Sequence, residues 1–375
     1  MSNHQVVDQL NRHLAFLAQD ENNLSLLVKI SDLYVELNDL NSAQEYLNRA
    51  NAIDRIACLG YQGLLHLNMG QFEQAKKHFT EALNYQDTSA LRYNLGFAYF
   101  ITSDLENAVR ILSPIIDKEH HFEAMQLLAR AYHGQGKLEQ ASTLINTVLT
   151  QDDTHSEALS ILALLQFDND ENELALQTAE RALAIDPDNY DAKLIKNMLG
   201  LVDQKTSAED VEQLLQINPD DCRSWFTLGN VHLGQGNLSD AEECLKKALI
   251  IYPEFYDCSI ALGWCLLLQD KMKEAFTMYQ AAATTEPEMA DSWGGLGLIH
   301  ALKEELNKAQ EYIQKSLTLN PECFLAEIAQ VIYYNHTNPL HAKEHLLTVL
   351  KNTQVPVSEK LVSIIEEMHI PIQLH

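Results

Sequence analysis

The sequence predicts an all-α solenoid, in which short helix pairs stack along one dimension. Two observations indicate this fold class. Apolar residues follow the helical period of about 3.6 and show no strand-like alternation. Small residues also recur at spacings of 32 to 34 residues, a period that is typical of solenoid repeats. The recurring residues are ten alanines, Ala43, Ala75, Ala108, Ala141, Ala175, Ala208, Ala241, Ala275, Ala309 and Ala342.

The stretch from Trp225 to Pro253 shows how the pattern predicts each helix pair. The first helix carries Gly229 and the second carries Ala241, and a glycine-bearing turn joins them. Small residues at these two positions allow the helix backbones to approach closely, and Pro253 ends the second helix. Neither helix is long enough to bury its apolar face alone. Neighbouring units must therefore cover each other's apolar faces.

These residues resemble the tetratricopeptide repeat. The unit from Trp225 to Pro253 matches the family pattern almost throughout, and the two following units, ending at Pro287 and Pro321, match nearly as well. The resemblance covers about residues 24–350. It implies a right-handed superhelix of stacked helix-turn-helix units, whose concave groove binds partner peptides.

The resemblance divides the chain into three parts. Residues 1–23 are expected to form an amino-terminal capping helix, and residues 24–350 an array of about ten repeats. Residues 351–375 are expected to form a carboxy-terminal capping helix and tail, with an amphipathic helix over 357–368, because the ends of a solenoid need a polar outer face.

One repeat, near residues 188–220, diverges from the others. It keeps Ala208 and Pro219 but has Ile195 and Met198 in place of the leucine–glycine pair. Ordinary degeneracy of repeats explains this divergence, and a flexure between two halves of the chain is the alternative.

Composition excludes several classes of function. The chain has 26 Lys and Arg against 53 Asp and Glu, a formal net charge of −27, which disfavours binding to nucleic acids and to anionic membranes. The amino terminus lacks a secretory signal, and no stretch reaches the roughly 20 apolar residues of a membrane span. The six cysteines lack zinc or redox spacing and are expected to be free thiols. These features predict a soluble, cytoplasmic protein and leave its oligomeric state open.

Catalysis is not expected, because the repeats fill the chain and leave no catalytic domain. We expect no catalytic residues, metal or cofactor. The strongest competing motif is H-x-x-E-H at His341, Glu344 and His345, which has the spacing of one metalloprotease class. It falls in the second helix of the last repeat, where Ala342 and Leu346 are packing residues. A solvated helix face is the favoured interpretation, and a metal-dependent hydrolase is the alternative.

A second stripe on each first helix is the candidate binding site. Packing between repeats uses one stripe of each first helix. The next residue along the chain lies about 100° further around the helix, and such residues define the second stripe. In the family, this second stripe lines the groove. It would be polar if it faced only water, yet here it is mainly apolar. Its candidate residues are Leu64, Leu67, Tyr93, Phe97, Phe100, Arg130, Leu164, Phe167, Phe226, Asn230, Trp264 and Leu267.

The apolar stripe and the acidic charge together predict a protein partner. An amphipathic helix or an extended apolar segment would fit the stripe, with basic flanks to meet the acidic rim. The expected role is an adaptor or scaffold. A dedicated chaperone, masking one client segment for assembly or secretion, is the alternative in the same class. The stripe would lose this role if tight curvature or an end segment buried it.

Overall fold

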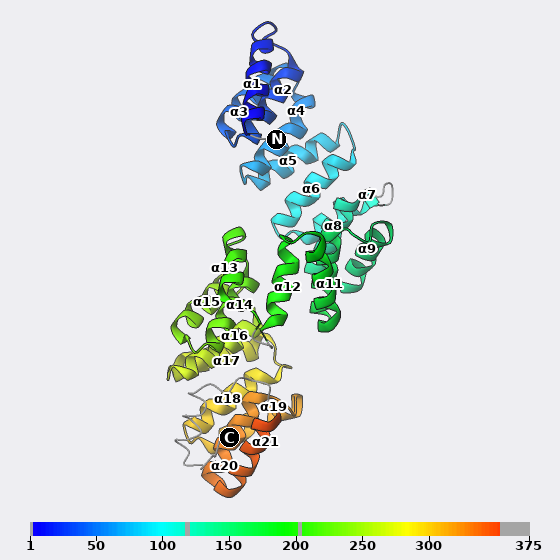
Figure 1. Ribbon diagram of the computed structural model, residues 1–375. Helices are drawn as coiled ribbons and strands as arrows, with labels where there is room; N and C mark the ends of the chain where they lie inside the picture. Colours follow the sequence, from blue (N-terminus) through cyan, green and yellow to red (C-terminus); the bar gives the residue numbers. More distant parts are fainter. Residues whose placement is uncertain (1–2, 117–120, 202–204, 353–375) are drawn as a thin grey trace. The chain divides into compact units, whose positions relative to one another are not determined.

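The computed structural model of the chain describes residues 3–116, 121–201 and 205–352. These residues form 21 helices and no strand (Figure 1), which confirms the all-α fold class. The chain divides into two compact units, Met1–Pro187 and Asp188–His375, and each unit has buried apolar clusters of its own. The helix expected over 357–368 lies outside the described residues.

The described part of unit 1 consists of one single helix followed by five helix pairs. In each pair a short turn joins the first helix to the second, and the two pack against each other, as the repeat pattern predicts. The bounds are α1 (Asn3–Leu17), then α2 (Leu24–Glu36) with α3 (Leu40–Ile53), α4 (Arg55–Asn68) with α5 (Phe72–Leu83), α6 (Ser89–Ile101) with α7 (Leu105–Ile116), α8 (Phe122–Gly134) with α9 (Leu138–Gln151), and α10 (Ser156–Asp168) with α11 (Asn172–Ile185).

In its described residues, unit 2 continues the same pattern with five further pairs. Their bounds are α12 (Tyr190–Gly200) with α13 (Ala208–Ile217), α14 (Cys222–Gly234) with α15 (Leu238–Ile251), α16 (Tyr256–Leu268) with α17 (Met272–Thr285), α18 (Ala290–Leu302) with α19 (Leu306–Leu319), and α20 (Phe324–Thr337) with α21 (Pro339–Asn352).

The recurring alanines lie where the two helices of a pair meet. Nine of the ten have no solvent exposure, and each of these nine is the fourth residue of its second helix. Ala208 is the exception. It is the first residue of α13 and is only half-buried, while Val211 and Leu214 are fully buried in the same helix. The divergent repeat therefore retains both helices, but its second helix is shorter and begins at the alanine position instead of one turn before it.

The turn within most helix pairs contains a left-handed residue at a fixed repeat position. Eight of the described pairs show this feature, with φ between 58° and 77°. A left-handed residue closes the first helix and reverses the chain. Glycine adopts this conformation freely, and Asn and Asp tolerate it, whereas Ser and Glu are less favourable. The residues are Asn38, Gly70, Ser103, Gly136, Asp170, Gly236, Asp270 and Glu304.

Glycines in the first helices make room for large side chains of the second helices. A Cβ on Gly229 would lie 2.7 Å from Cγ of Leu245, so the two helices meet as expected. The fully buried ring of Tyr279, on α17, lies between two glycines. A Cβ on Gly263 of α16 would come within 2.7 Å of this ring, and one on Gly295 of α18 within 2.5 Å.

Helix α1 packs on the first repeats through its apolar face. Val6, Leu10 and Leu17 are buried in one cluster with Leu27 and Leu33 of α2. Among the described residues, no helix combines the length and the apolar character needed to cross a bilayer.

All six cysteines are free, as the sequence predicts. Five are buried and Cys222 is half-buried. Burial raises the pKa of the Cys258 thiol to about 12, and this thiol donates to the Leu245 carbonyl oxygen at 3.3 Å. Thiols held neutral in this way are unreactive and act as small packing groups.

Candidate functional site

In unit 1, the second stripe is open on α4. Leu64 is 38% exposed, and Tyr61, one turn earlier on the same side, is 40% exposed. Leu67 is half-buried and packs against a cluster that contains the fully buried Phe79. Tyr61 was not among the predicted residues, and its spacing of three residues from Leu64 is the signal that would have found it.

On α6 the side chains of the predicted aromatic residues are partly exposed and partly packed into the core. Tyr93, Phe97 and Phe100 are half-buried, and Ile101 at the end of the helix is exposed. Tyr93 also stacks on His121, the N-cap of α8, with ring centroids 5.7 Å apart. All three aromatic rings pack against one buried cluster of Leu112, Ile115, Ala124, Leu127 and Leu128.

On α8 the stripe is polar, and its side chains interact with side chains of α10. Nη2 of Arg130 lies 2.6 Å from Oε1 of Glu157. His133, also on α8, forms a hydrogen bond with Asp168 of α10. Arg130 is therefore engaged in joining two first helices, which weakens its candidacy as an anchor for a partner.

In unit 2, the predicted residues of α14 form a small surface group. Phe226 is half-buried and lies against the ring of Phe255, the N-cap of α16, with centroids 4.9 Å apart. Asn230 is also half-buried and donates through Nδ2 to the Phe226 carbonyl oxygen at 2.9 Å. The Asn230 side chain is therefore already hydrogen-bonded to the backbone of its own helix.

On α18 the stripe is covered by the first helix of the last repeat, α20. A Cβ on Gly294 would lie 2.8 Å from the backbone nitrogen of Ala326, so the two helix backbones approach closely at this glycine. The next residue position of the stripe, Leu298, is buried. Helix α20 also reaches α16, where the rings of Phe324 and Trp264 are nearly perpendicular, with centroids 6.0 Å apart. Trp264 is half-buried.

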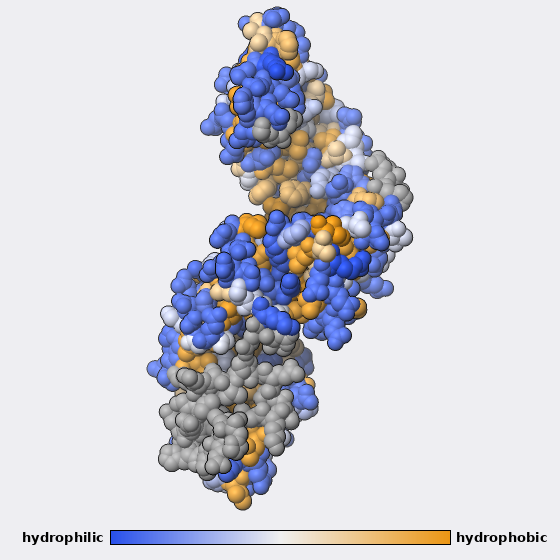
Figure 2. Space-filling view, viewed as in Figure 1, coloured by the Kyte–Doolittle hydropathy of each residue, from blue (hydrophilic) through white to orange (hydrophobic). Residues whose placement is uncertain are grey.

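Two predicted residues are buried rather than exposed on the surface. Leu164 on α10 is 8% exposed and Leu267 on α16 is 7% exposed, while Phe167 is half-buried. The surface seen in Figure 2 is mainly hydrophilic, with smaller apolar groups, one of them over the α5–α6 part of unit 1. Of the predicted apolar stripe, Leu64 on α4 is the most accessible residue, and the aromatic residues on α6 are half-buried.

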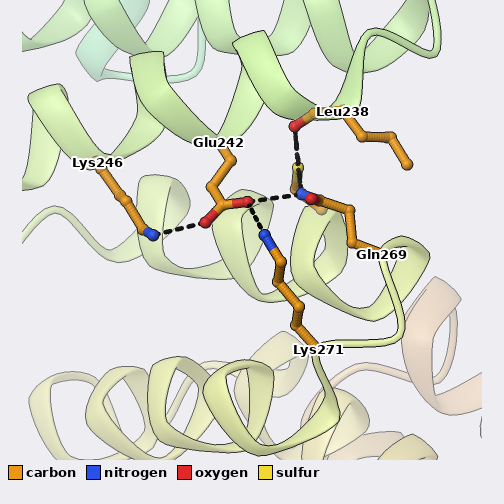
Figure 3. A network of polar contacts seen from close by, with 6 residues as sticks. Leu238, Glu242, Lys246, Gln269 and Lys271 are labelled. Atoms are coloured by element: carbon orange, nitrogen blue, oxygen red, sulfur yellow. Dashed lines mark hydrogen bonds and ion pairs between the residues drawn. The ribbon is translucent and has the colours of Figure 1, made fainter.

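A network around Glu242 is a strongly perturbed polar site. Burial acts to raise the pKa of Glu242, but hydrogen bonds from Lys246, Lys271 and Gln269 outweigh it and lower the value to about 2. Lys246, Lys271 and Gln269 lie 2.5, 2.6 and 2.8 Å from the carboxylate oxygens (Figure 3). Gln269 also donates to the Leu238 carbonyl oxygen at 3.2 Å. Perturbed groups are candidates for catalysis, but both oxygens here are already engaged. Oε1 pairs with Lys246 on the same helix, and Oε2 joins α15 to Gln269 and Lys271 in the next repeat.

The H-x-x-E-H residues are engaged with their neighbours. Nε2 of His345 lies 2.7 Å from Oε2 of Glu327 on α20. The ring of His341 lies edge-on to Tyr334, with centroids 4.5 Å apart. Within the described ranges, no three His, Cys, Asp or Glu side chains converge in a way that could hold a metal ion.

Comparison with protein families agrees with this architecture. Models described as tetratricopeptide repeat match residues 24–56, 62–113, 102–165, 222–255 and 290–323. These segments cover more than half of the chain and fall on its helix pairs. The chain belongs to the tetratricopeptide-repeat family. Such repeats are protein–protein interaction modules, so the protein is an interaction scaffold in this broad sense.

Individual relatives are distant. Protein O-mannosyl-transferase TMTC1 of Homo sapiens is 26% identical over 203 residues, which are 51% of this chain and 23% of that protein. Lipopolysaccharide assembly protein B of Escherichia coli K12 is 21% identical over 240 residues, 60% of this chain and 61% of that protein. The chain thus matches less than two thirds of either relative.

A solved structure shows the same fold. The crystal structure of the APC/C hetero-tetramer Cut9-Hcn1 matches with a TM-score of 0.53 and 16% identity, covering 95% of this chain and 79% of that chain. At this level of identity the likeness concerns the fold alone.

Proposed function

We propose that this protein is a non-enzymatic adaptor or scaffold that binds an amphipathic helix or extended apolar segment of a partner on its first helices. The exposure of Tyr61 and Leu64, side by side on α4, carries this proposal. Apolar surface gains about 25 cal/mol per Å² when it leaves water. Exposed apolar side chains on one helix face, continued by the α6 aromatic residues, are typical of an interaction site.

The acidic charge of this chain favours a partner with basic residues on either side of its apolar segment. Asp32 on α2 lies 32 residues before Leu64, at the equivalent repeat position, and Glu36 follows one turn later. Burial raises the pKa of Asp32, an effect that Lys29 opposes and Glu36 reinforces. With a net charge of −27 across the chain, lysines or arginines beside the apolar residues of a partner would be attracted to this rim.

The presence of a candidate face in each unit favours a scaffold over a chaperone for a single client. Unit 1 presents Tyr61 and Leu64, and unit 2 presents Phe226 on α14. A scaffold would hold two segments at once, whereas a chaperone would hold one. The free, buried cysteines suit a reducing compartment, and we place the protein in the cytoplasm.

The test uses a defined probe, a synthetic amphipathic peptide of about 18 residues, or five helical turns, with leucines on one face and lysines at both ends. Tyr61→Ala combined with Leu64→Ala is expected to weaken binding about tenfold or more, with an unchanged melting temperature, because both side chains are exposed. Leu174→Ala is the matched control, since Leu174 is 49% exposed on a second helix, α11.

Two further readouts complete this test. Raising the ionic strength is expected to weaken binding of the lysine-flanked peptide, because salt screens exposed charges. A peptide of the same composition with its leucines dispersed around the helix is expected not to bind. Equal affinity of the α4 double variant and Leu174→Ala would reject the proposed face. A saturation stoichiometry of one peptide per chain would favour the chaperone.

A further inference from the structure

The second helix of the last repeat, α21, carries two exposed leucines on one face. Leu340 is 75% exposed and Leu347 is 41% exposed. They are the second and ninth residues of α21, and a spacing of seven residues places them on the same side of the helix. The buried side of α21 is a different one, where Ala342 and Leu346 lie fully buried in the core cluster of unit 2. Leu340 and Leu347 are therefore not used in packing the last helix pair.

This apolar pair departs from the repeat pattern. In the described chain, eight other second helices also carry the recurring alanine as their fourth residue, and in all eight the second and ninth residues are polar. On α19, for example, these residues are Asn307 and Gln314, and both are exposed although α20 follows. Stacking of a further repeat would therefore not cover Leu340 and Leu347. Exposed leucines in place of polar residues indicate an additional contact at this face.

The chain itself supplies an apolar segment next to this face. Residues 357–368, with the sequence VSEKLVSIIEEM, follow the end of α21 after a connection of four residues, 353–356. A connection of about two to five residues returns a second helix antiparallel to the first. Leu361 and Met368 are seven residues apart, which is also the spacing of Leu340 and Leu347. An antiparallel return that brings Leu361 beside Leu347 brings Met368 beside Leu340.

Charge also favours this segment as the occupant. Lys343 lies one turn after Leu340, and among the described residues it forms no ion pair. Its neighbour Glu344 lies 3.9 Å from Nδ1 of His341 on the same helix. The segment has a formal charge of −2, from three glutamates and one lysine, Glu359, Glu366, Glu367 and Lys360. A second copy of the chain would instead bring a further charge of −27, which opposes association.

We propose that residues 357–368 pack as an amphipathic helix on α21 and cover Leu340 and Leu347. Leu361 and Met368 make the two apolar contacts. Glu366 lies two residues before Met368 and therefore about 200° away around such a helix, on the side that faces water. The segment thus replaces an apolar face at the end of the array with a polar one. This contact is independent of the partner face on α4.

Limited proteolysis of the full-length chain tests this contact, because Lys360 is a trypsin site inside the segment. A packed helix must open before a protease can cut it, so cleavage after Lys360 is expected to be slow in the wild type. Leu340→Asp combined with Leu347→Asp is expected to speed this cleavage about tenfold or more, because it raises the open population. Leu340→Met combined with Leu347→Met keeps the apolar contact and is expected to retain the wild-type rate. Leu174→Asp, on the exposed side of α11, is the control and is also expected to retain it.

Photo-crosslinking identifies the occupant without disturbing the face. Benzoylphenylalanine at position 347 of the full-length chain is expected to crosslink to residues 357–368 of the same molecule, as identified by mass spectrometry of its peptides. The same group at position 174 is the control and is expected not to reach this segment. Two results would overturn the proposal. One is an equal rate of cleavage after Lys360 in the wild type and the double aspartate variant. The other is crosslinking from position 347 to a second molecule, or to no residue of 357–368.

Discussion

Replacing Gly295 with alanine is the sharpest test of how the repeats pack. The added methyl group would lie 2.5 Å from Cδ1 and Cε1 of Tyr279, whereas carbon atoms normally meet at about 3.5–4.0 Å. The ring has no free direction in which to move, because it is fully buried and already lies against Gly263 on its other side.

The expected loss of stability follows from two opposing effects. Overpacking a buried site costs about 1–3 kcal/mol, and the upper end applies to a ring held between two helices. Alanine is also a better helix former than glycine by about 1 kcal/mol, which offsets part of that cost. We therefore expect Gly295→Ala to lower the free energy of unfolding by about 2 kcal/mol.

Urea unfolding, followed by circular dichroism, measures this difference against a matched control. Gly234→Ala places a methyl group at the end of α14, where no atom lies within 4 Å of the added Cβ. This control is expected to be neutral or to stabilise by up to about 1 kcal/mol. Equal unfolding midpoints for the two variants would refute the close contact between Tyr279 and Gly295.

Two further predictions concern polar contacts within and between repeats. Since the Glu242 network lowers the pKa from 4.5 to about 2, its stabilisation is complete above pH 4.5 and declines as the pH falls toward 2. The stability difference between wild type and Glu242→Gln should shrink over that interval, and a pH-independent difference would contradict it. Trp225→Phe should cost about 1–2 kcal/mol, because it removes the 2.8 Å hydrogen bond to the Pro219 carbonyl oxygen and weakens the contact with Lys247. An unchanged melting temperature would show that this bond is not stabilising.

The repeat architecture could be predicted from the sequence because its signals are local and periodic. A buried position such as Ala241 accepts only a small side chain, so the residue spacing directly reflects the packing. The turns were harder to predict. Glycine marks the left-handed position at Gly70, but Ser103 and Glu304 adopt the same conformation without any such signal, because the helix packing on both sides imposes it.

The accessibility of the stripe could not be predicted, since it depends on contacts between different repeats. Helical period places Leu64 and Leu267 on equivalent faces, yet one is exposed and the other buried. In unit 2, Gly294 is the residue that would have indicated burial of the stripe, because it allows α20 to approach α18 closely. Periodicity describes one helix at a time and does not say which face another helix will cover.

Photo-crosslinking at position 64 would show whether a partner segment lies on α4. Benzoylphenylalanine is placed at Leu64 on α4 and, in a separate protein, at Leu174 on α11, and each is irradiated with the lysine-flanked amphipathic peptide. Both positions are exposed and apolar, and they lie on a first and a second helix respectively. We predict crosslinking at position 64 that excess unlabelled peptide suppresses and high salt reduces, with little at position 174. Equal crosslinking at the two positions, or crosslinking at position 174 alone, would contradict binding on the first helices.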